Sequence, residues 1–197
     1  MRELINMVVV LTLISAFSGG LLAKIKDSTS ERIENQTLEF VKGPAIRGIF
    51  KGSSNDPIAD RFKLKSGDAE ESFFVGKFDG TADSVAFESF AKGFGGYIGV
   101  MVGVNLKDDK LIGVAVTTHN ETPGVGALAK TEPDFAAQFK GKPFTGAFKI
   151  RGDGGQVDAL SGATVTSRGI ATALTDAEKM YKNLKPQIEE KLKSFSN

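Results

Sequence analysis

Residues 97–118 read YIGVMVGVNLKDDKLIGVAVTT, and this stretch decides the expected fold. Two runs rich in apolar and β-branched residues, 97–104 and 111–118, flank the charged tetrapeptide 107–110. Such runs on either side of a short polar segment are typical of two antiparallel strands joined by a turn. We therefore predict a β-hairpin here, and further strands at residues 72–78, 85–90 and 148–150.

A long amphipathic helix is expected in the C-terminal part of the chain. Apolar residues spaced by four, three, four and three predict that it begins near Thr166 or Ser167: Ile170, Leu174, Ala177, Tyr181 and Leu184. Because proline disrupts a helix interior, we expect Pro186 to end it. A shorter helix is predicted at residues 131–140. Antiparallel strands with helices packed on them make an α+β domain.

The N-terminal end has a different composition. Residues 4–23 (LINMVVVLTLISAFSGGLLA) carry no charge, and a helix of this length covers the roughly 30 Å core of a bilayer. A cleaved signal peptide has a shorter apolar run, of about 7–15 residues, and an A-x-A-like end, so we favour a permanent anchor. Lysine and arginine counts at its two ends are nearly equal and give no orientation. We predict an anchor helix at 1–27, a juxtamembrane segment at 28–47 and one domain at 48–197.

The composition excludes several kinds of chemistry. The 197 residues include no Cys and a single His, which rules out disulfides and iron–sulfur clusters and leaves a zinc site very poor in ligands. A formal net charge of +1 gives no reason to expect nucleic acid. His119, the one imidazole, lies at a predicted strand end, where a solvated loop residue is the default. We expect neither a catalytic residue nor a metal site.

A glycine-rich stretch, GFGGYIG at residues 93–99, precedes the first strand of the hairpin. A dinucleotide-binding G-x-G-x-x-G loop opens a helix, whereas this stretch opens a strand and has Ile98 at the last glycine position. A glycine turn is therefore the preferred interpretation. Gly95 and Gly96 would also let the backbone approach a flat ligand closely.

The loop after the hairpin reads ETPGVG at residues 121–126. Glu121, Thr122, Pro123 and Gly124 leave the predicted strand together. They form either a tight turn or a site that offers backbone N–H groups and a carboxylate to a polar planar ligand.

The strongest candidate site is DALSGATVTS at residues 158–167. Hydroxyls and small residues gather where the long helix is expected to begin, and a helix N-terminus has unpaired N–H groups and a partial positive charge that suit a phosphate. The alternative is a helix cap, for which Ser and Thr are preferred, but one cap does not need four hydroxyls within seven residues. The predicted site residues are Ser161, Gly162, Ala163, Thr164, Val165 and Thr166.

The pattern Asp158-x-x-Ser161-Gly162-Ala163-Thr164 resembles the flavinylation motif of the FMN-binding domains in the G subunit of Rnf complexes and the C subunit of Na+-translocating NADH:quinone reductase. The resemblance extends, in order, to the single N-terminal span, the glycine stretch at 93–96 and the loop at 119–126. The short length favours the Rnf G subunit. Two positions depart from the family pattern: Phe94, where tyrosine is usual, and Val125, where leucine is frequent.

The resemblance implies FMN joined through its phosphate to the hydroxyl of Thr164 by a flavin transferase of the ApbE type, which would recognise Asp158. It further implies electron transfer within a membrane complex that couples ferredoxin and NAD redox chemistry to pumping of Na+ or protons. The partners would be the other subunits, and the domain would lie on the extracytoplasmic side. From the residues alone, a membrane-anchored module for an anionic ligand and a purely structural subunit remain open.

Overall fold

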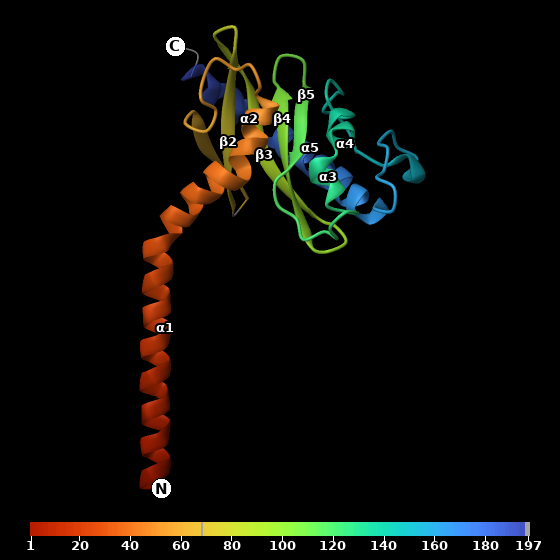
Figure 1. Cartoon of the computed structure of the whole chain (residues 1–197). Helices are drawn as coiled ribbons and strands as arrows, with labels where there is room; N and C mark the ends of the chain where they lie inside the picture. Colours follow the sequence, from red (N-terminus) through yellow and green to blue (C-terminus); the bar gives the residue numbers. More distant parts are fainter. Residues whose placement is uncertain (68, 196–197) are drawn as a thin grey trace. The chain divides into compact units, whose positions relative to one another are not determined.

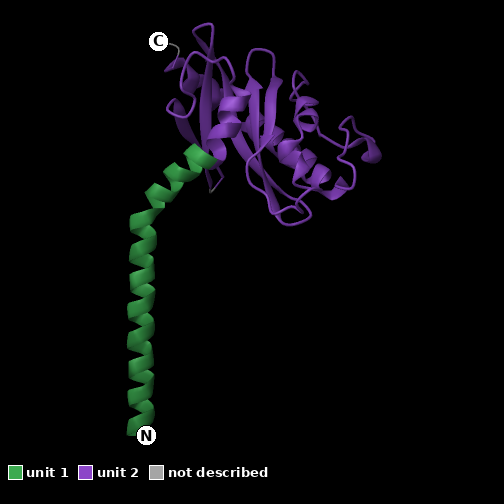
Figure 2. Ribbon diagram, viewed as in Figure 1, with its two compact units in different colours: residues 1–40 green, residues 41–197 purple. Residues whose placement is uncertain are grey.

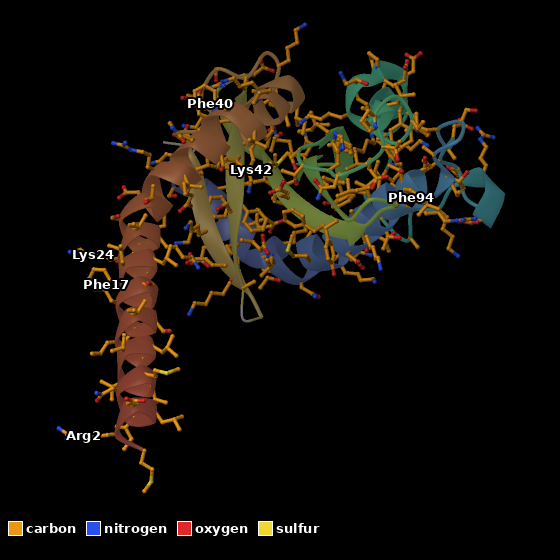
Figure 3. The ribbon with its side chains drawn as sticks, turned by 60° about the horizontal axis from the view of Figure 1, so that its bottom comes forward. Arg2, Phe17, Lys24, Phe40, Lys42 and Phe94 are labelled. Carbon is orange, nitrogen blue, oxygen red and sulfur yellow. The ribbon has the colours of Figure 1, made fainter. Side chains whose placement is uncertain are left out.

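The computed structural model describes residues 1–67 and 69–195, and the chain divides into two compact units, Met1–Phe40 and Val41–Asn197 (Figure 2). The first unit consists mainly of α1 (Arg2–Gln36), whose residues are all outside any core. Side chains along it project away from the helix axis, as Phe17 does in Figure 3. By length and composition, this helix could cross a membrane.

The helix continues beyond the apolar run, as a π-helical segment η1 (Thr37–Lys42) follows α1 directly. Along the chain, the boundary between the two compact units falls between Phe40 and Val41. The predicted roles of residues 1–27 as membrane anchor, 28–47 as juxtamembrane segment and 48–197 as FMN-binding domain stay a prediction.

The second unit is built on a five-stranded antiparallel sheet with strand order β1-β2-β3-β4-β5 (Figure 1). Each strand pairs with the next along the chain, and Val100 lies opposite Val116 in the predicted hairpin, which is confirmed. The predicted strands at 72–78 and 85–90 lie within longer ones. The strands are β1 (Arg61–Ser66), β2 (Ala69–Phe78), β3 (Thr81–Lys92), β4 (Tyr97–Asn105) and β5 (Lys110–Val116).

The long helix α5 (Thr164–Lys193) covers one face of this sheet and confirms the α+β fold class. Its apolar stripe, which includes Leu174 and Tyr181, packs against inward-facing residues of β3 and β4 such as Phe87 and Val102. The rings of Phe87 and Tyr181 stack at 6.4 Å between centroids. Burial of such large apolar side chains is the dominant source of folding free energy.

The helix does not end at Pro186, contrary to the prediction from sequence. It continues to Lys193, and the buried residues Ile188 and Leu192 extend the same stripe at four-residue spacing. The proline removes one backbone hydrogen bond. Each fully buried aliphatic side chain contributes about 1.5–3 kcal/mol, so burial beyond the proline offsets that loss.

The helix predicted at 131–140 is shorter in the structure, where α4 spans Pro133–Ala137, and a separate turn of helix, α3 (Leu128–Thr131), precedes it. Glu132 between them is extended, with ψ of 108°. Proline disfavours the helical conformation of the residue that precedes it, and Pro133 therefore separates the two turns.

One strand predicted from the sequence is absent, and one strand of the sheet was not predicted. Residues 148–150 form no strand, since only Ile150 makes an isolated bridge, to Val157, before the short 3-10 helix η2 (Arg151–Asp153). Strand β1 was missed, although Phe62 and Leu64 alternate there with Arg and Lys. The charged residues around Phe62 and Leu64 made the alternation of apolar and polar residues, which is typical of a strand with one buried face, difficult to recognise in the sequence.

A short helix, α2 (Gly43–Ile49), lies on the sheet face opposite α5 (Figure 1). It lies close to the strands because glycines leave room for its side chains. A Cβ atom built on Gly103 would come within 2.3 Å of the Ile49 side chain, and one on Gly76 within 2.5 Å of the Phe50 ring. The glycines of β2 and β4 are therefore a packing requirement of this layer.

A polar cluster on the same side fixes the end of β5. The ammonium of Lys42 (Figure 3) lies 2.6 Å from the buried carboxylate of Glu88 on β3, which also accepts a hydrogen bond from the hydroxyl of Thr117. The carbonyl of Thr117 accepts a hydrogen bond from Lys130 at 2.8 Å. These contacts hold the chain where it leaves the sheet toward residues 119–126.

A second polar cluster ties α5 to the turn between β4 and β5. The carboxylate of Asp109 accepts hydrogen bonds from the Tyr181 hydroxyl at 2.6 Å and from Lys185 at 2.7 Å. Desolvation opposes ionisation of Asp109, but these hydrogen bonds and the charge of Lys185 outweigh it and lower the pKa of this carboxyl below its ordinary value. Burial and the neighbouring carboxylate raise the pKa of Tyr181, which stays a donor.

Gly103 and Gly113 are cross-strand partners and provide a matched test of the α2 packing. We expect Gly103→Ala to lower the free energy of unfolding by about 1–3 kcal/mol through overpacking against Ile49. Gly113→Ala meets Ile49 only at 3.4 Å and should change stability by less than about 0.5 kcal/mol. Urea unfolding of the full chain in mild detergent, followed by circular dichroism, measures both. Equal effects of the two substitutions would contradict the packing argument.

Asp109→Asn should destabilise the fold by about 1 kcal/mol at pH 7, because a partly exposed charge-assisted cluster is lost. Asn tolerates the left-handed backbone at this position, where φ is +50°. Since the folded-state pKa is depressed, the contribution is complete above about pH 4 and disappears as the pH falls through the folded-state pKa. The stability difference between variant and parent should vanish there. The control is Asp108→Asn, because Asp108 forms only an exposed pair with Lys110. Its stability should differ little from that of the parent, both at pH 7 and below the folded-state pKa of Asp109.

Candidate functional site

The N-terminus of α5 begins earlier than the sequence predicted, at Thr164. A turn at Ser161 and Gly162 precedes it, and Gly162 has φ of +72°, a conformation that favours glycine. Ala163 is the residue at the N-cap position. This turn places three of the four hydroxyl residues of the 158–167 stretch, Thr164, Thr166 and Ser167, on the first turn of the helix.

None of the nearby hydroxyls caps this helix. Ser167 donates to the carbonyl of Ala163 and accepts from the N–H of Leu160, both at 3.0 Å. Thr166 donates to the carboxylate of Glu121. The hydroxyl of Thr164 has no hydrogen-bond partner among residues 1–67 and 69–195, and Thr164 is exposed.

The backbone of the first turn is equally open. The N–H of Ser167 is the first to donate to a carbonyl of the helix, that of Ala163 at 3.0 Å. The N–H groups of residues 164–166 have no acceptor among the described residues. A 30-residue helix that starts without a side-chain cap presents unpaired donors and the positive end of its dipole to whatever lies in front of it.

A cavity of about 420 Å³ lies in front of this helix start, within the size range of small-molecule sites. It is formed where three segments far apart in the sequence meet: the glycine stretch, the 121–126 loop and the first turn of α5. Its lining residues are Phe94, Glu121, Thr122, Val125, Gly126, Gly162, Ala163, Thr164, Val165 and Thr166.

Glu121 joins the three segments. This residue is only 5% exposed. One oxygen, Oε1, accepts a hydrogen bond from the N–H of Gly95 at 2.9 Å, and the other accepts the hydroxyl of Thr166. The glycine stretch, the loop and the helix are thereby held together around one side chain.

Three apolar side chains at the cavity are unusually exposed. Phe94 is 72% exposed, Val165 46% and Val125 39%. Phe94 is labelled in Figure 3. Large apolar side chains left open beside a cavity offer contact surface to a flat, partly apolar ligand.

Seven of the predicted site residues line the cavity, whereas five do not. Gly95, Gly96, Pro123 and Gly124 lie outside the lining, and Ser161 lines a neighbouring hollow with Asp158. Gly95 has a different role from the one considered in the sequence, because a Cβ there would lie 2.0 Å from the carbonyl oxygen of Asn120. Its closeness to the protein backbone, rather than to a ligand, requires glycine.

Three residues that line the cavity were not among the site residues predicted from the sequence: Phe94, Val125 and Gly126. All three lie inside the two loop motifs, so their position in those motifs was the available signal. A Cβ on Gly126 would meet Glu121 and Thr166 at 2.8 Å, which explains why glycine stands there.

Asp158 lies at the surface beside this site. Its carboxylate pairs with Arg151 at 2.5 Å, and Gln138 holds its backbone through hydrogen bonds to both the N–H and the carbonyl. It is therefore presented in a fixed, exposed geometry. His119 accepts the N–H of Glu121 at 3.3 Å, and no group of three metal-binding side chains occurs in the described ranges.

The residues present fit an FMN group. The phosphate requires hydrogen-bond donors, which the open N–H groups of 164–166 provide, and the flat ring system requires apolar surface, which Phe94, Val125 and Val165 provide. The free hydroxyl of Thr164 lies on the same wall.

Known proteins match both this region and the whole chain. A family model described as an FMN-binding domain matches residues 93–179, which include all three segments of the cavity. The G subunit of the ion-translocating oxidoreductase complex of Pseudomonas aeruginosa is 30% identical over 193 residues, covering 91% of this chain and 89% of the relative. The protein of the same description from Cereibacter sphaeroides is 32% identical over 169 residues, covering 81% and 76%.

Solved structures agree in fold. The C subunit of Na+-translocating NADH-quinone reductase from Parabacteroides distasonis superposes with a TM-score of 0.56 at 21% identity, covering 77% of this chain and 94% of that one. NqrC from Shewanella oneidensis gives 0.51 at 27% identity, covering 68% and 72%. Because relatives of 30% and 32% identity are matched over 89% and 76% of their length, the chain belongs to the family of G subunits of ion-translocating oxidoreductase complexes, and it contains an FMN-binding domain.

Proposed function

We propose that this chain is the electron-transfer subunit of an Rnf-type complex and carries FMN covalently, through a phosphoester to the hydroxyl of Thr164. The observation that carries this proposal is the state of Thr164. Its hydroxyl is exposed and free of partners among the described residues, and it stands in the cavity wall at the uncapped start of α5.

The charges around the cavity favour a covalent over a purely ionic attachment. No Lys or Arg occurs among the described residues that line it, so a phosphate would depend on backbone N–H groups and the helix dipole alone. Such contacts are weak compared with bidentate pairs to arginine. An ester bond retains the cofactor without them, and it also reduces the phosphate charge that must lie near Glu121.

The ester requires an activated flavin nucleotide. In the step we infer, the oxygen of Thr164 forms a bond to the flavin phosphorus while the bond from that phosphorus to a second nucleotide's phosphate breaks. The second nucleotide leaves, and the hydroxyl proton passes to a base of the transferase. Asp158, exposed and held by Arg151 and Gln138, is placed to be recognised by that enzyme.

FMN, when bound, supplies the electron-carrying chemistry. The chain would position the cofactor: the open N–H groups of residues 164–166 would hold its phosphate, and Phe94, Val125 and Val165 offer apolar surface for its ring. Helix α1, which could cross a membrane by its length and composition, would keep the domain beside its partner subunits. We further propose that the domain lies on the extracytoplasmic side and that the complex couples ferredoxin and NAD redox chemistry to Na+ or proton transport.

Thr164→Val should abolish covalent flavin when the chain is co-expressed with its transferase, since the attacking oxygen is absent. Thr172→Val, an exposed threonine further along α5, is the matched control and should keep full loading. Flavin fluorescence that migrates with the denatured polypeptide on a gel measures both. Flavin retained on Thr164→Val would place the bond elsewhere. A parent chain without covalent flavin would instead favour a binding module for a free anionic ligand.

A further inference from the structure

Glu121 is the one charged side chain among the described residues that line the cavity. Both of its carboxylate oxygens are already used by the protein, in hydrogen bonds from Gly95 and Thr166. Neither donor carries a charge, and within the described part of the chain no Lys, Arg or His forms an ion pair with it. A carboxylate therefore lies in the cavity wall with two neutral hydrogen-bond donors and, within the described part of the chain, no cation in ion-pair contact.

Such a charge acts on a bound group through its electric field. Burial lowers the local dielectric constant and strengthens the interaction, and salt screens little inside a cavity. Reduction of a flavin adds electrons, and a nearby uncompensated negative charge opposes this addition. The effect has a definite sign: it lowers the reduction potential and makes the reduced flavin a stronger reductant for the next carrier.

We propose that Glu121 is the residue that sets the reduction potential of the flavin, through its uncompensated charge, in addition to positioning the loops of the site. This inference rests on the proposed function, because it requires a flavin in the cavity. It assigns Glu121 no direct bond to the cofactor, since its two oxygens are occupied by Gly95 and Thr166.

A purely structural role for Glu121 predicts different behaviour from an electrostatic one. Glu121→Gln keeps the size of the side chain, an oxygen for the N–H of Gly95 and an amide that can donate to the oxygen of Thr166, but it removes the charge. Thr166→Val keeps the charge and removes one dipole that stabilises it. The electrostatic role therefore predicts shifts of opposite sign, whereas loop displacement gives no reason for opposite signs.

The test is a redox titration of the full-length, covalently flavinylated protein in detergent, followed by flavin absorbance in the presence of mediator dyes. At a fixed ambient potential, Glu121→Gln should increase the ratio of reduced to oxidised flavin at least tenfold, equivalent to about 30 mV for a two-electron couple. Thr166→Val should decrease this ratio. Glu132→Gln, which removes an exposed carboxylate outside the cavity, is the control and should change it less than twofold.

An unchanged ratio in Glu121→Gln with normal flavin content would overturn the inference, as would a shift of both variants in the same direction. If Glu121→Gln does not fold or accept flavin, Thr166→Val decides: a lowered potential supports the inference, and an unchanged or raised one refutes it. Absence of covalent flavin from the parent chain would be a failure of the proposed function instead, and the gel measurement detects it independently.

Discussion

The packing of α5 against the sheet is the contact on which the rest of this domain depends. The apolar stripe of the helix buries the inner face of β3 and β4, and this burial fixes where the helix begins. The fit is tight at the N-terminal end, where a Cβ on Gly169 would lie 2.8 Å from the carbonyl oxygen of Lys92. A helix held this closely delivers its open first turn to the glycine stretch between β3 and β4.

The candidate site follows from that placement. The first turn of α5 supplies unpaired N–H groups and the free hydroxyl of Thr164, and the two loops supply the remaining walls. Glycines at 95 and 126 bring backbone and side chains close enough for Glu121 to bridge them. The site therefore combines the free hydroxyl of Thr164, the positive end of a helix dipole and one buried carboxylate, that of Glu121.

The opposite face of the sheet is covered by α2. Helix α2 follows directly from the segment that leaves the apolar helix, and it is held by glycine-lined packing and by the ion pair between Lys42 and Glu88. The same cluster reaches Thr117 at the end of β5. Helix α2 and the loop that carries Glu121 are thus both held against the same sheet.

The sequence by itself determined the apolar N-terminal helix, the antiparallel hairpin, the long amphipathic helix and the motif that contains Thr164. All of these are expressed in local periodicity or composition. The continuation of α5 through Pro186 and the existence of β1 depended on burial against distant partners, which local propensity does not record. The same holds for the site. The hydrogen bonds of Glu121 are made to Gly95, 26 positions before it, and to Thr166, 45 positions after it. Local sequence does not record contacts over such separations, so only the tertiary structure shows that this predicted site residue is a buried carboxylate that bridges two other segments.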